Sequence, residues 1–415
     1  MQNKSKVKVI QREELSIPNL IEVTNRRDDW VLYGETNNYP DYLLSLLEKS
    51  AIHKSIQMGK QDMVVGDGFK LVDENAPIDI KTAINKFILS PNDTETLEDI
   101  TYKIALDLIV YGGYALNVIW SKDKKTIAAV YHVDYGKLRV GKPDENGDVT
   151  HFYYSNDWSQ YKKPGFEPQK MAIFSTDDRK DPSQIYICKE YNPVSAYYAI
   201  PQYSAAIPYV EIDYEIGMYH WNNIKNGLSP NYIMQLNNGI PEEEEQDELQ
   251  RQIKAELTGH RGNKIMLTFG NSADQAPTVI PINTTDADKQ FLTLNDAVLQ
   301  ALCTANKITS PMLLGIKTPG QLGGRQELLD AYDLYYSTVI NKLQKHILKT
   351  YHKILAINGI DAKLDFIKSE PLPFVLSENA LLQVATQNEI RDMIGLKPID
   401  NNPAPAAPAP TQPTA

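Results

Sequence analysis

The sequence predicts an α+β protein, and three observations carry that prediction. Several segments have helical periodicity, an alternating stretch after residue 113 indicates strands, and two long helical segments flank a small insertion. At 415 residues the chain exceeds the usual size of a single hydrophobic core, so we expect two or three subdomains.

The first half of the chain combines helices with alternating segments. Residues 1–50 read as an N-terminal arm that holds one short helix through Leu43, Leu44 and Leu47. A helix over 51–63 and a strand broken by a turn over 63–71 follow. A helix is predicted over 96–111, because its first turn is acidic and Gly112-Gly113 ends it. Alternation then predicts an antiparallel sheet. Its strands are expected over 114–120, 127–133, 138–140 and 151–154.

The second half holds two long amphipathic helices, predicted over 206–226 and 286–308. The insertion between them reads as strand 232–236, helix 241–257 and strands 265–269 and 279–282. A glycine-rich loop of low bulk follows. After it, a helix is predicted over 325–357. A strand over 364–367, a last helix over 379–394 and an extended Pro/Ala tail over 401–415 complete the chain.

Composition and motifs exclude several classes of protein. A net charge of −11 argues against a broad grip on nucleic acid, which needs clustered Lys and Arg. The two cysteines lack CxxC spacing and the seven histidines lack HExxH spacing, so no metal site is expected. No GxxxxGK[ST] or GxSxG motif is present, so we expect no cofactor, no catalytic residue and no enzyme. No apolar run approaches bilayer length, so we expect no membrane partner.

Element order over residues 50–400 resembles the portal proteins of tailed bacteriophages, in the HK97-type family. The helix-Gly-Gly-strand segment 104–118 is similar to the portal wing, and 222–230 is similar to the exit from the first stem helix. Segment 291–308 followed by 311–315 is similar to the second stem helix running into the tunnel loop, and 388–398 is similar to the closing segment. The resemblance implies the following divisions: an α+β wing at 51–204, stem helix 1 at 205–226, a small α/β clip at 227–284, stem helix 2 at 285–308, a tunnel loop at 309–324, and a long helix, wing return and short crown at 325–400.

That resemblance also implies a function. A portal is a structural virion protein that forms a ring, here expected to be a homododecamer, at one capsid vertex. Viral DNA is packaged and ejected through the ring. The implied partners are double-stranded DNA in the channel, held weakly and non-specifically, the terminase large subunit, the head–tail connector or adaptor, and the major capsid protein. The implied location is the virion, and the host cytoplasm during assembly.

Three groups of residues follow from the resemblance. The expected DNA-channel loop comprises Lys317, Pro319, Gly320, Gln321, Gly323, Gly324 and Arg325. The expected clip residues that dock the motor and connector are Glu242, Glu243, Glu244, Glu245, His260, Arg261 and Lys264. The expected subunit interface is Trp221, Phe291, Leu294, Val298 and Leu302. Each group has a plainer reading: a surface turn, solvated helix faces, and two helices packed on each other within one chain.

Two other functions stay open on the sequence. One is a phage-encoded, metal-dependent nucleic-acid enzyme of unrecognised α+β fold. It would need clustered carboxylates for Mg²⁺, and the densest run is 242–245. The other is a monomeric minor capsid or adaptor protein. Native mass separates the adaptor from the portal, because a monomer weighs 46.8 kDa and a ring more than ten times that.

Overall fold

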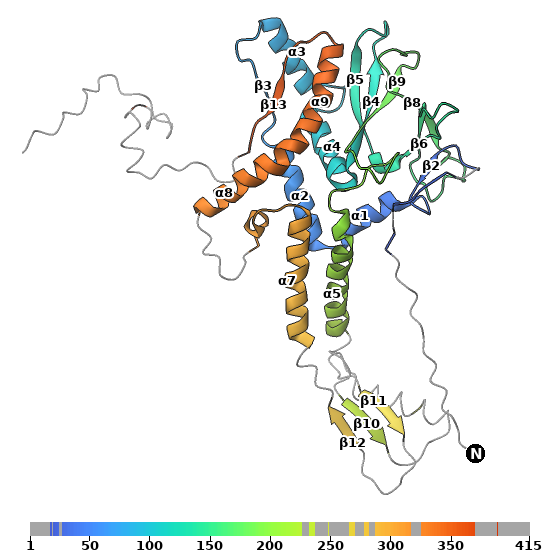
Figure 1. Ribbon diagram of the computed structural model, residues 1–415, viewed down its shortest axis with the longest axis vertical. Coiled ribbons are helices and arrows are strands. Elements are labelled where there is room, and N and C mark those ends of the chain that lie inside the picture. Colours follow the sequence, from blue (N-terminus) through green and yellow to red (C-terminus); the bar gives the residue numbers. More distant parts are fainter. Residues whose placement is uncertain are drawn as a thin grey trace, which may run out of the picture. The chain divides into compact units, whose positions relative to one another are not determined.

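The computed structural model describes most of the chain (Figure 1). The described residues are 17–18, 20–24, 27–225, 232–236, 248, 265–269, 278–281, 287–316, 325–369 and 388. Internal contacts divide the chain into residues 1–369 and residues 370–415, and every helix and strand named below belongs to the first unit. This unit has the predicted α+β character, with helices packed against a mostly antiparallel sheet.

The main sheet has six strands in the order β5-β4-β9-β8-β7-β6. They are β4 (Gly113–Trp120), β5 (Ile127–Val133), β6 (Leu138–Val140), β7 (His151–Tyr154), β8 (Gln169–Ile173) and β9 (Ser183–Lys189). The four strands that alternation predicts are all present. The prediction of a wholly antiparallel sheet is wrong at one place, because β8 and β9 run parallel over two residue pairs. Neither of these strands was predicted from the sequence, and β9 lies in the middle of the sheet beside β4.

Helix α4 (Leu97–Tyr111) packs against β4 and begins and ends where the sequence predicts. Thr96 and Asp99 form a capping box, in which each side chain bonds the backbone N–H of the other residue. Gly112 ends the helix at a φ of 84°. A Cβ there would lie 2.6 Å from the carbonyl oxygen of Ile200, so both backbone conformation and space require glycine.

Two hydrophobic cores share α4 and β4. Tyr114, Leu116 and Val118 enter the first core, which also holds the buried face of the long C-terminal helix. Ala115, on the other face of the same strand, enters the second core together with β2 (Val31–Tyr33) and α1 (Tyr39–Lys49). The strand therefore joins the two cores into one body, by which we mean residues 20–206 together with 325–369.

Much of the expected N-terminal arm belongs to this body. Val31, Tyr33 and Leu43 are fully buried. β1 (Glu22–Thr24) pairs with β2, and the Glu22 carboxylate accepts hydrogen bonds from the backbone N–H groups of residues 196–198. The sequence missed these contacts because their partners lie more than 170 residues away.

The long C-terminal helix predicted over 325–357 is present with one irregularity. It comprises α8 (Arg325–Tyr335), a π-helical turn (Tyr336–Ile340) and α9 (Asn341–Ile357). An aromatic and aliphatic stripe of this helix lies in the first core. Its buried members are Tyr335, Val339, Leu343 and Ile347. β13 (Leu364–Phe366) then pairs with β3 (Phe69–Leu71), which returns the chain to the body.

Three further helices of the body surround α4. They are α1, α2 (Ala51–Val65) and α3 (Ile78–Leu89). The chain turns at Gly66 before β3, so the predicted broken strand over 63–71 is helical in its first part and a strand only at its end.

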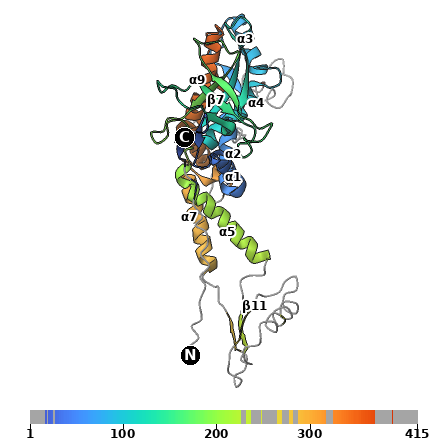
Figure 2. The same cartoon turned by 90° about the vertical axis from the view of Figure 1, so that its right-hand side faces the viewer.

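The two long central helices are α5 (Ile207–Lys225) and α7 (Ala287–Ala305), and they pack against each other (Figure 2). We call them the helical pair. The insertion between them contains β10 (Tyr232–Leu236), β11 (Ile265–Phe269) and β12 (Thr278–Pro281), in the order β11-β10-β12. β10 and β11 run parallel, and β12 is antiparallel to β10. The helix predicted over 241–257 lies outside the described residues except for Glu248, which is helical.

Candidate functional site

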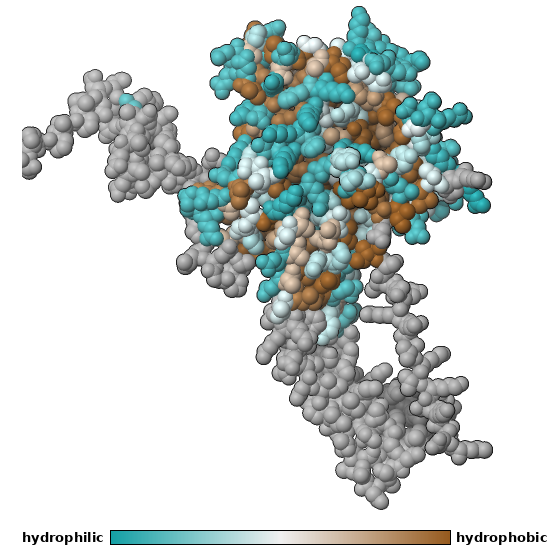
Figure 3. All heavy atoms as spheres, viewed as in Figure 1, coloured by the Kyte–Doolittle hydropathy of each residue, from teal (hydrophilic) through white to brown (hydrophobic). Residues whose placement is uncertain are grey.

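Burial falls sharply along α5. Val210 is fully buried near its start, and Ile216 is 7% exposed. Trp221 and Ile224, near its end, are 57% and 75% exposed. A gradient of this kind on one helix leaves large apolar side chains that the described residues do not cover. Hydrophobic side chains are visible on the surface of the pair in Figure 3.

Along α7, burial increases from the N-terminal part of the helix toward its C-terminal end. Val298 and Leu302 are fully buried and join Val210 in the second core. Leu294, one turn earlier, is 36% exposed. The part of the pair nearest the body is therefore an intrachain core, and the part beyond it is not.

A groove of about 540 Å³ lies between the beginning of α5 and the C-terminal half of α7. It is lined by small side chains, among them Ala205 beside α5 and Ala297, Ala301 and Thr304 on α7. Tyr209 borders it and is 39% exposed. Small side chains on both sides make room for a large apolar group.

A buried polar cluster joins the helical pair to the body. Lys60 and Gln57 on α2 both donate hydrogen bonds to Asn306 Oδ1, at 2.9 and 3.1 Å. Asn306 follows α7 directly and donates through Nδ2 to the carbonyl of Leu302. Gln57 also contacts His53 Nδ1 at 3.2 Å. We call Lys60, Gln57, His53 and Asn306 the joint, and all four are buried.

The Lys60 amine is a buried basic group of the joint. No carboxylate of the described residues bonds Lys60, and burial lowers the pKa of its amine to about 8. Burial also lowers the pKa of His53 to about 4, with the Lys60 ammonium acting in the same direction. Among the described residues, His53 Nε2 and Gln57 Oε1 have no hydrogen-bond partner. The position of α7 thus depends on a polar cluster that is costly to bury.

Two polar contacts fix α5 to the body. Lys49 at the end of α1 bonds the Glu211 carboxylate at 3.2 Å. The hydroxyl of Ser50 donates to Asp213 at 2.6 Å, while it accepts from the backbone N–H of His53. Both helices of the pair are therefore tied to the α1–α2 corner.

The segment after α7 turns tightly before the glycine-rich loop. Lys307 has a φ of 56°, and Ser310 caps a short 3₁₀ helix, Pro311–Leu314. The hydroxyl of Thr309 donates to the carbonyl of Ala331 on α8 at 2.6 Å. The turn and α8 are thereby held together.

The residues expected in this loop and in the clip mostly lie outside the described residues. These are Lys317, Pro319, Gly320, Gln321, Gly323 and Gly324 in the loop, and Glu242, Glu243, Glu244, Glu245, His260, Arg261 and Lys264 in the clip. Arg325 begins α8, but its side chain is not among those described.

The expected interface residues separate into two groups. Trp221 and Leu294 are exposed, and we keep them in the proposed interface. Val298 and Leu302 have no accessible surface, so we assign them to the core of the subunit. Phe291 lies in α7, with its side chain outside the described set.

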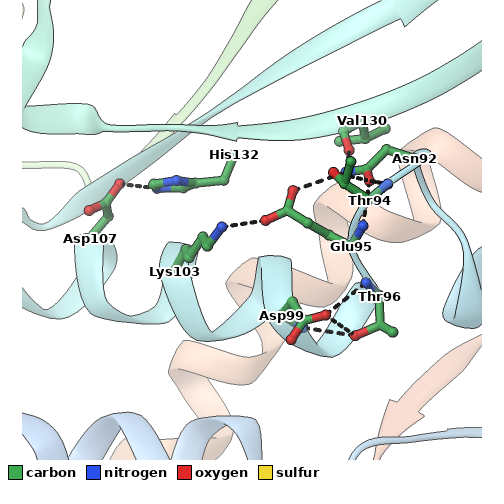
Figure 4. A network of polar contacts seen from close by, with 9 residues as sticks. All are labelled: Asn92, Thr94, Glu95, Thr96, Asp99, Lys103, Asp107, Val130 and His132. Carbon is green, nitrogen blue, oxygen red and sulfur yellow. Dashed lines mark hydrogen bonds and ion pairs between the residues drawn. The ribbon is translucent and has the colours of Figure 1, made fainter. Parts of the chain in front are cut away.

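A polar network on α4 and β5 has a structural role (Figure 4). His132 on β5 bonds the buried Asp107 on α4 at 2.8 Å, and burial raises the pKa of that carboxyl. Asn92 accepts from the N–H groups of Thr94 and Glu95 and donates to the carbonyl of Val130. These bonds hold a loop along β5, an edge strand of the sheet.

Nothing in the described part of the chain forms a metal or membrane-spanning site. Within those residues, no group of three or more His, Cys, Asp or Glu side chains is placed to hold a metal ion. Likewise, no described helix is both long and apolar enough to cross a bilayer.

Sequence reasoning missed the joint entirely. Lys60 and Gln57 look like ordinary polar positions of an amphipathic helix, and Asn306 lies about 250 residues away. No local pattern marks such a contact, because only the tertiary fold brings the three side chains together.

The fold is similar to chains in solved structures of gene transfer agent necks and of a phage portal protein. No protein-family model and no curated protein sequence matches the chain. It is 14% identical to a chain from the neck of an empty gene transfer agent particle, with a TM-score of 0.55 over 87% of this chain and 94% of that one. A chain from the native particle's neck with C12 symmetry gives 14% identity and a TM-score of 0.53 over 87% and 95%. The HK97-family phage portal protein from Corynebacterium diphtheriae gives 11% identity and a TM-score of 0.50 over 83% and 98%. The chain therefore has the portal fold.

Proposed function

We propose that this chain is the subunit of a ring-shaped viral portal, a structural protein through which double-stranded DNA is packaged and ejected. The observation that carries the proposal is a portal fold whose helical pair leaves Trp221, Ile224 and Leu294 exposed. A monomer gains nothing from such a face. A ring in which each pair packs against its neighbour buries it.

The parts of the proposed subunit follow from this arrangement. The helical pair, α5 and α7, forms the wall of the channel as the stem. Residues 309–324 form the tunnel loop, whose anchored ends let a low-bulk segment narrow the bore. Lys317 and Arg325 touch passing phosphates weakly, which guides DNA without arresting it.

The insertion at 227–284 is the proposed clip. Its acidic run at 242–245 and the basic residues His260, Arg261 and Lys264 dock the terminase large subunit and later the head–tail connector. The body, as the wing, contacts the major capsid protein. We propose a dodecamer located in the virion, assembled in the host cytoplasm, with no cofactor and no enzymatic activity.

Particle imaging and native mass test the proposal directly. The purified protein is examined by negative stain and by native mass spectrometry across a range of concentrations. We expect closed rings with a central hole wide enough for duplex DNA and a mass about twelve times 46.8 kDa. A monomer at every concentration would contradict the proposal and favour the adaptor reading. Metal-dependent cleavage of duplex DNA by the same sample would contradict the structural role and favour the enzyme reading.

A further inference from the structure

Helix α9 presents a row of lysines on one face. Lys342, Lys345, Lys349 and Lys353 are separated by three, four and four residues, so they lie along one side of the helix. All four are exposed. The opposite side is fixed in the first core by a set of buried side chains. These are Leu343, Ile347, Tyr351 and Ile354. The core therefore sets the direction of the lysine face.

This face is basic in an otherwise acidic chain. The sequence of α9 contains no Asp or Glu, whereas α8, directly before it, carries Glu327, Asp330 and Asp333. Figure 3 shows hydrophilic side chains gathered over this helix. Against a net charge of −11, the segregation of charge along one long helix is a local feature of α9 and not of the whole surface.

The lysines are not neutralised within the described part of the chain. No ion pair among the described residues joins any of the four to a carboxylate. Lys353 Nζ lies 5.2 Å from the ring centroids of both Phe174 and Tyr186, contacts that leave its charge in place. Burial raises the pKa of the Cys188 thiol, and the nearby Lys349 ammonium acts against that rise, as expected of a charged amine.

The spacing and residue type identify a partner. The eleven helical rises from Lys342 to Lys353 span about 16 Å. Duplex DNA carries one negative charge per ~1.7 Å of its axis, so this length faces several phosphates. Lysines are point charges without the planar fork that reads bases, which favours backbone contact over sequence recognition. The described residues of this face include no row of exposed aromatic rings on which single-stranded bases would stack.

We propose that the lysine face of α9 is a non-specific contact for the phosphate backbone of double-stranded DNA. The choice of DNA over another polyanion rests on the proposed portal function. The contact lies on the body and is distinct from the tunnel loop. A subunit with two weak contact zones holds DNA along its path without tight binding at either one.

The test measures binding of a fluorescein-labelled 30-base-pair duplex of random sequence to the full chain, by fluorescence anisotropy from 50 to 200 mM salt. The test variant is K342Q/K345Q/K349Q/K353Q. The matched control is K54Q/K70Q/K122Q/K125Q, which removes the same charge from four other exposed lysines. A third variant replaces the four α9 lysines with arginine and keeps the charge.

Four phosphate contacts predict that log Kobs falls with log salt at a slope of about −3.6, which is a loss of about 100-fold over this range. We expect the α9 glutamine variant to bind at least fivefold more weakly at 50 mM salt with a shallower slope. The control and the arginine variant should bind like the original chain. Equal weakening of the test and control variants, or no weakening of either, would overturn the proposal.

Two further measurements are needed. The first distinguishes DNA from an acidic protein partner, and the second distinguishes failure of this inference from failure of the portal proposal. Polyglutamate of matched charge that competes as strongly as unlabelled duplex would overturn the choice of DNA and indicate an acidic protein partner. Native mass of each variant is recorded in the same buffer. Rings that form but bind DNA independently of α9 would refute this inference and leave the portal proposal intact. Absence of rings together with α9-dependent binding would refute the portal and support the lysine face.

Discussion

The body and the helical pair differ in how completely each buries its own apolar surface. In the body, α4, β4 and α9 meet in cores where side chains such as Ile104, Tyr114 and Ile347 are at most 1% exposed. In the helical pair, Trp221 and Ile224 are mostly exposed on the same helix that buries Val210. The body buries its own apolar side chains, whereas the outer part of the pair leaves apolar side chains exposed.

The joint lies where these two regions meet. Apolar packing alone would hold α7 in many similar positions, because it has no direction. The hydrogen bonds from Lys60 and Gln57 to Asn306 select one position, at the cost of burying a cation.

The largest expected effect is on ring assembly, and it comes from substitutions at the exposed end of α5. Trp221→Asp/Ile224→Asp places two charges on the proposed interface, and burying them costs several kcal/mol for each subunit contact. We expect loss of rings by native mass, with unchanged circular dichroism. The matched control is Ile78→Asp/Leu89→Asp, which alters side chains of the body that are 80% and 69% exposed. Rings that survive the first variant would contradict the assignment of this face.

A smaller effect is expected at the joint. Asn306→Ala leaves the Lys60 amine without its acceptor, and we expect it to lower the free energy of unfolding by about 3 kcal/mol. Urea denaturation of the monomeric W221D/I224D chain measures this. Gln300→Ala, at an exposed position of α7, should stay within about 0.5 kcal/mol. Lys60→Met combined with Asn306→Leu should recover most of the loss, because it removes the buried charge and its partner together.

The joint should also make stability depend on pH. His53 has a pKa of about 4 in the folded chain, below its ordinary value of 6.5, so the unfolded chain binds more protons between these values. Its contribution is complete above pH 6.5 and is lost as pH falls toward 4. We expect a decrease on the order of 3 kcal/mol over this window. His53→Gln should flatten the profile, because it removes the titrating imidazole. A profile unaffected by His53→Gln would show that the imidazole does not titrate as described.

The smallest effect concerns the body alone. Thr96→Ala removes the capping box of α4 and should cost about 1 kcal/mol, while Thr96→Ser should cost little. Ring mass should not change in either variant. A Thr96→Ala chain that unfolds normally but fails to assemble would mean that the body and the pair are coupled more closely than their packing indicates.

Local signals explain which parts of the fold the sequence predicts well. Helix α4 was predicted with its ends because the cap at Thr96 and the stop at Gly112 are contained in neighbouring residues. The strands from β4 to β7 follow from alternation. β8 and β9 were missed. Their parallel pairing depends on the path of the connection over 174–182, which the alternation of polar and apolar residues does not reveal.

The candidate site was less predictable for a physical reason. A stripe of apolar residues predicts that a helix face is buried, but not against what. Val298 and Leu302 belong to the same stripe as Leu294, and only the position of α5 and the body decides which are covered. The joint and the lysine face of α9 also depend on the fold, since burial makes Lys60 unusual and exposure makes Lys349 available.

A cryo-electron microscopy reconstruction of the purified assembly tests the central claim most directly. We predict a closed ring around a channel, with α5 and α7 of adjacent subunits in contact and Trp221, Ile224 and Leu294 buried between them. A reconstruction in which these three side chains face solvent, or a sample that contains only single chains, would contradict the account.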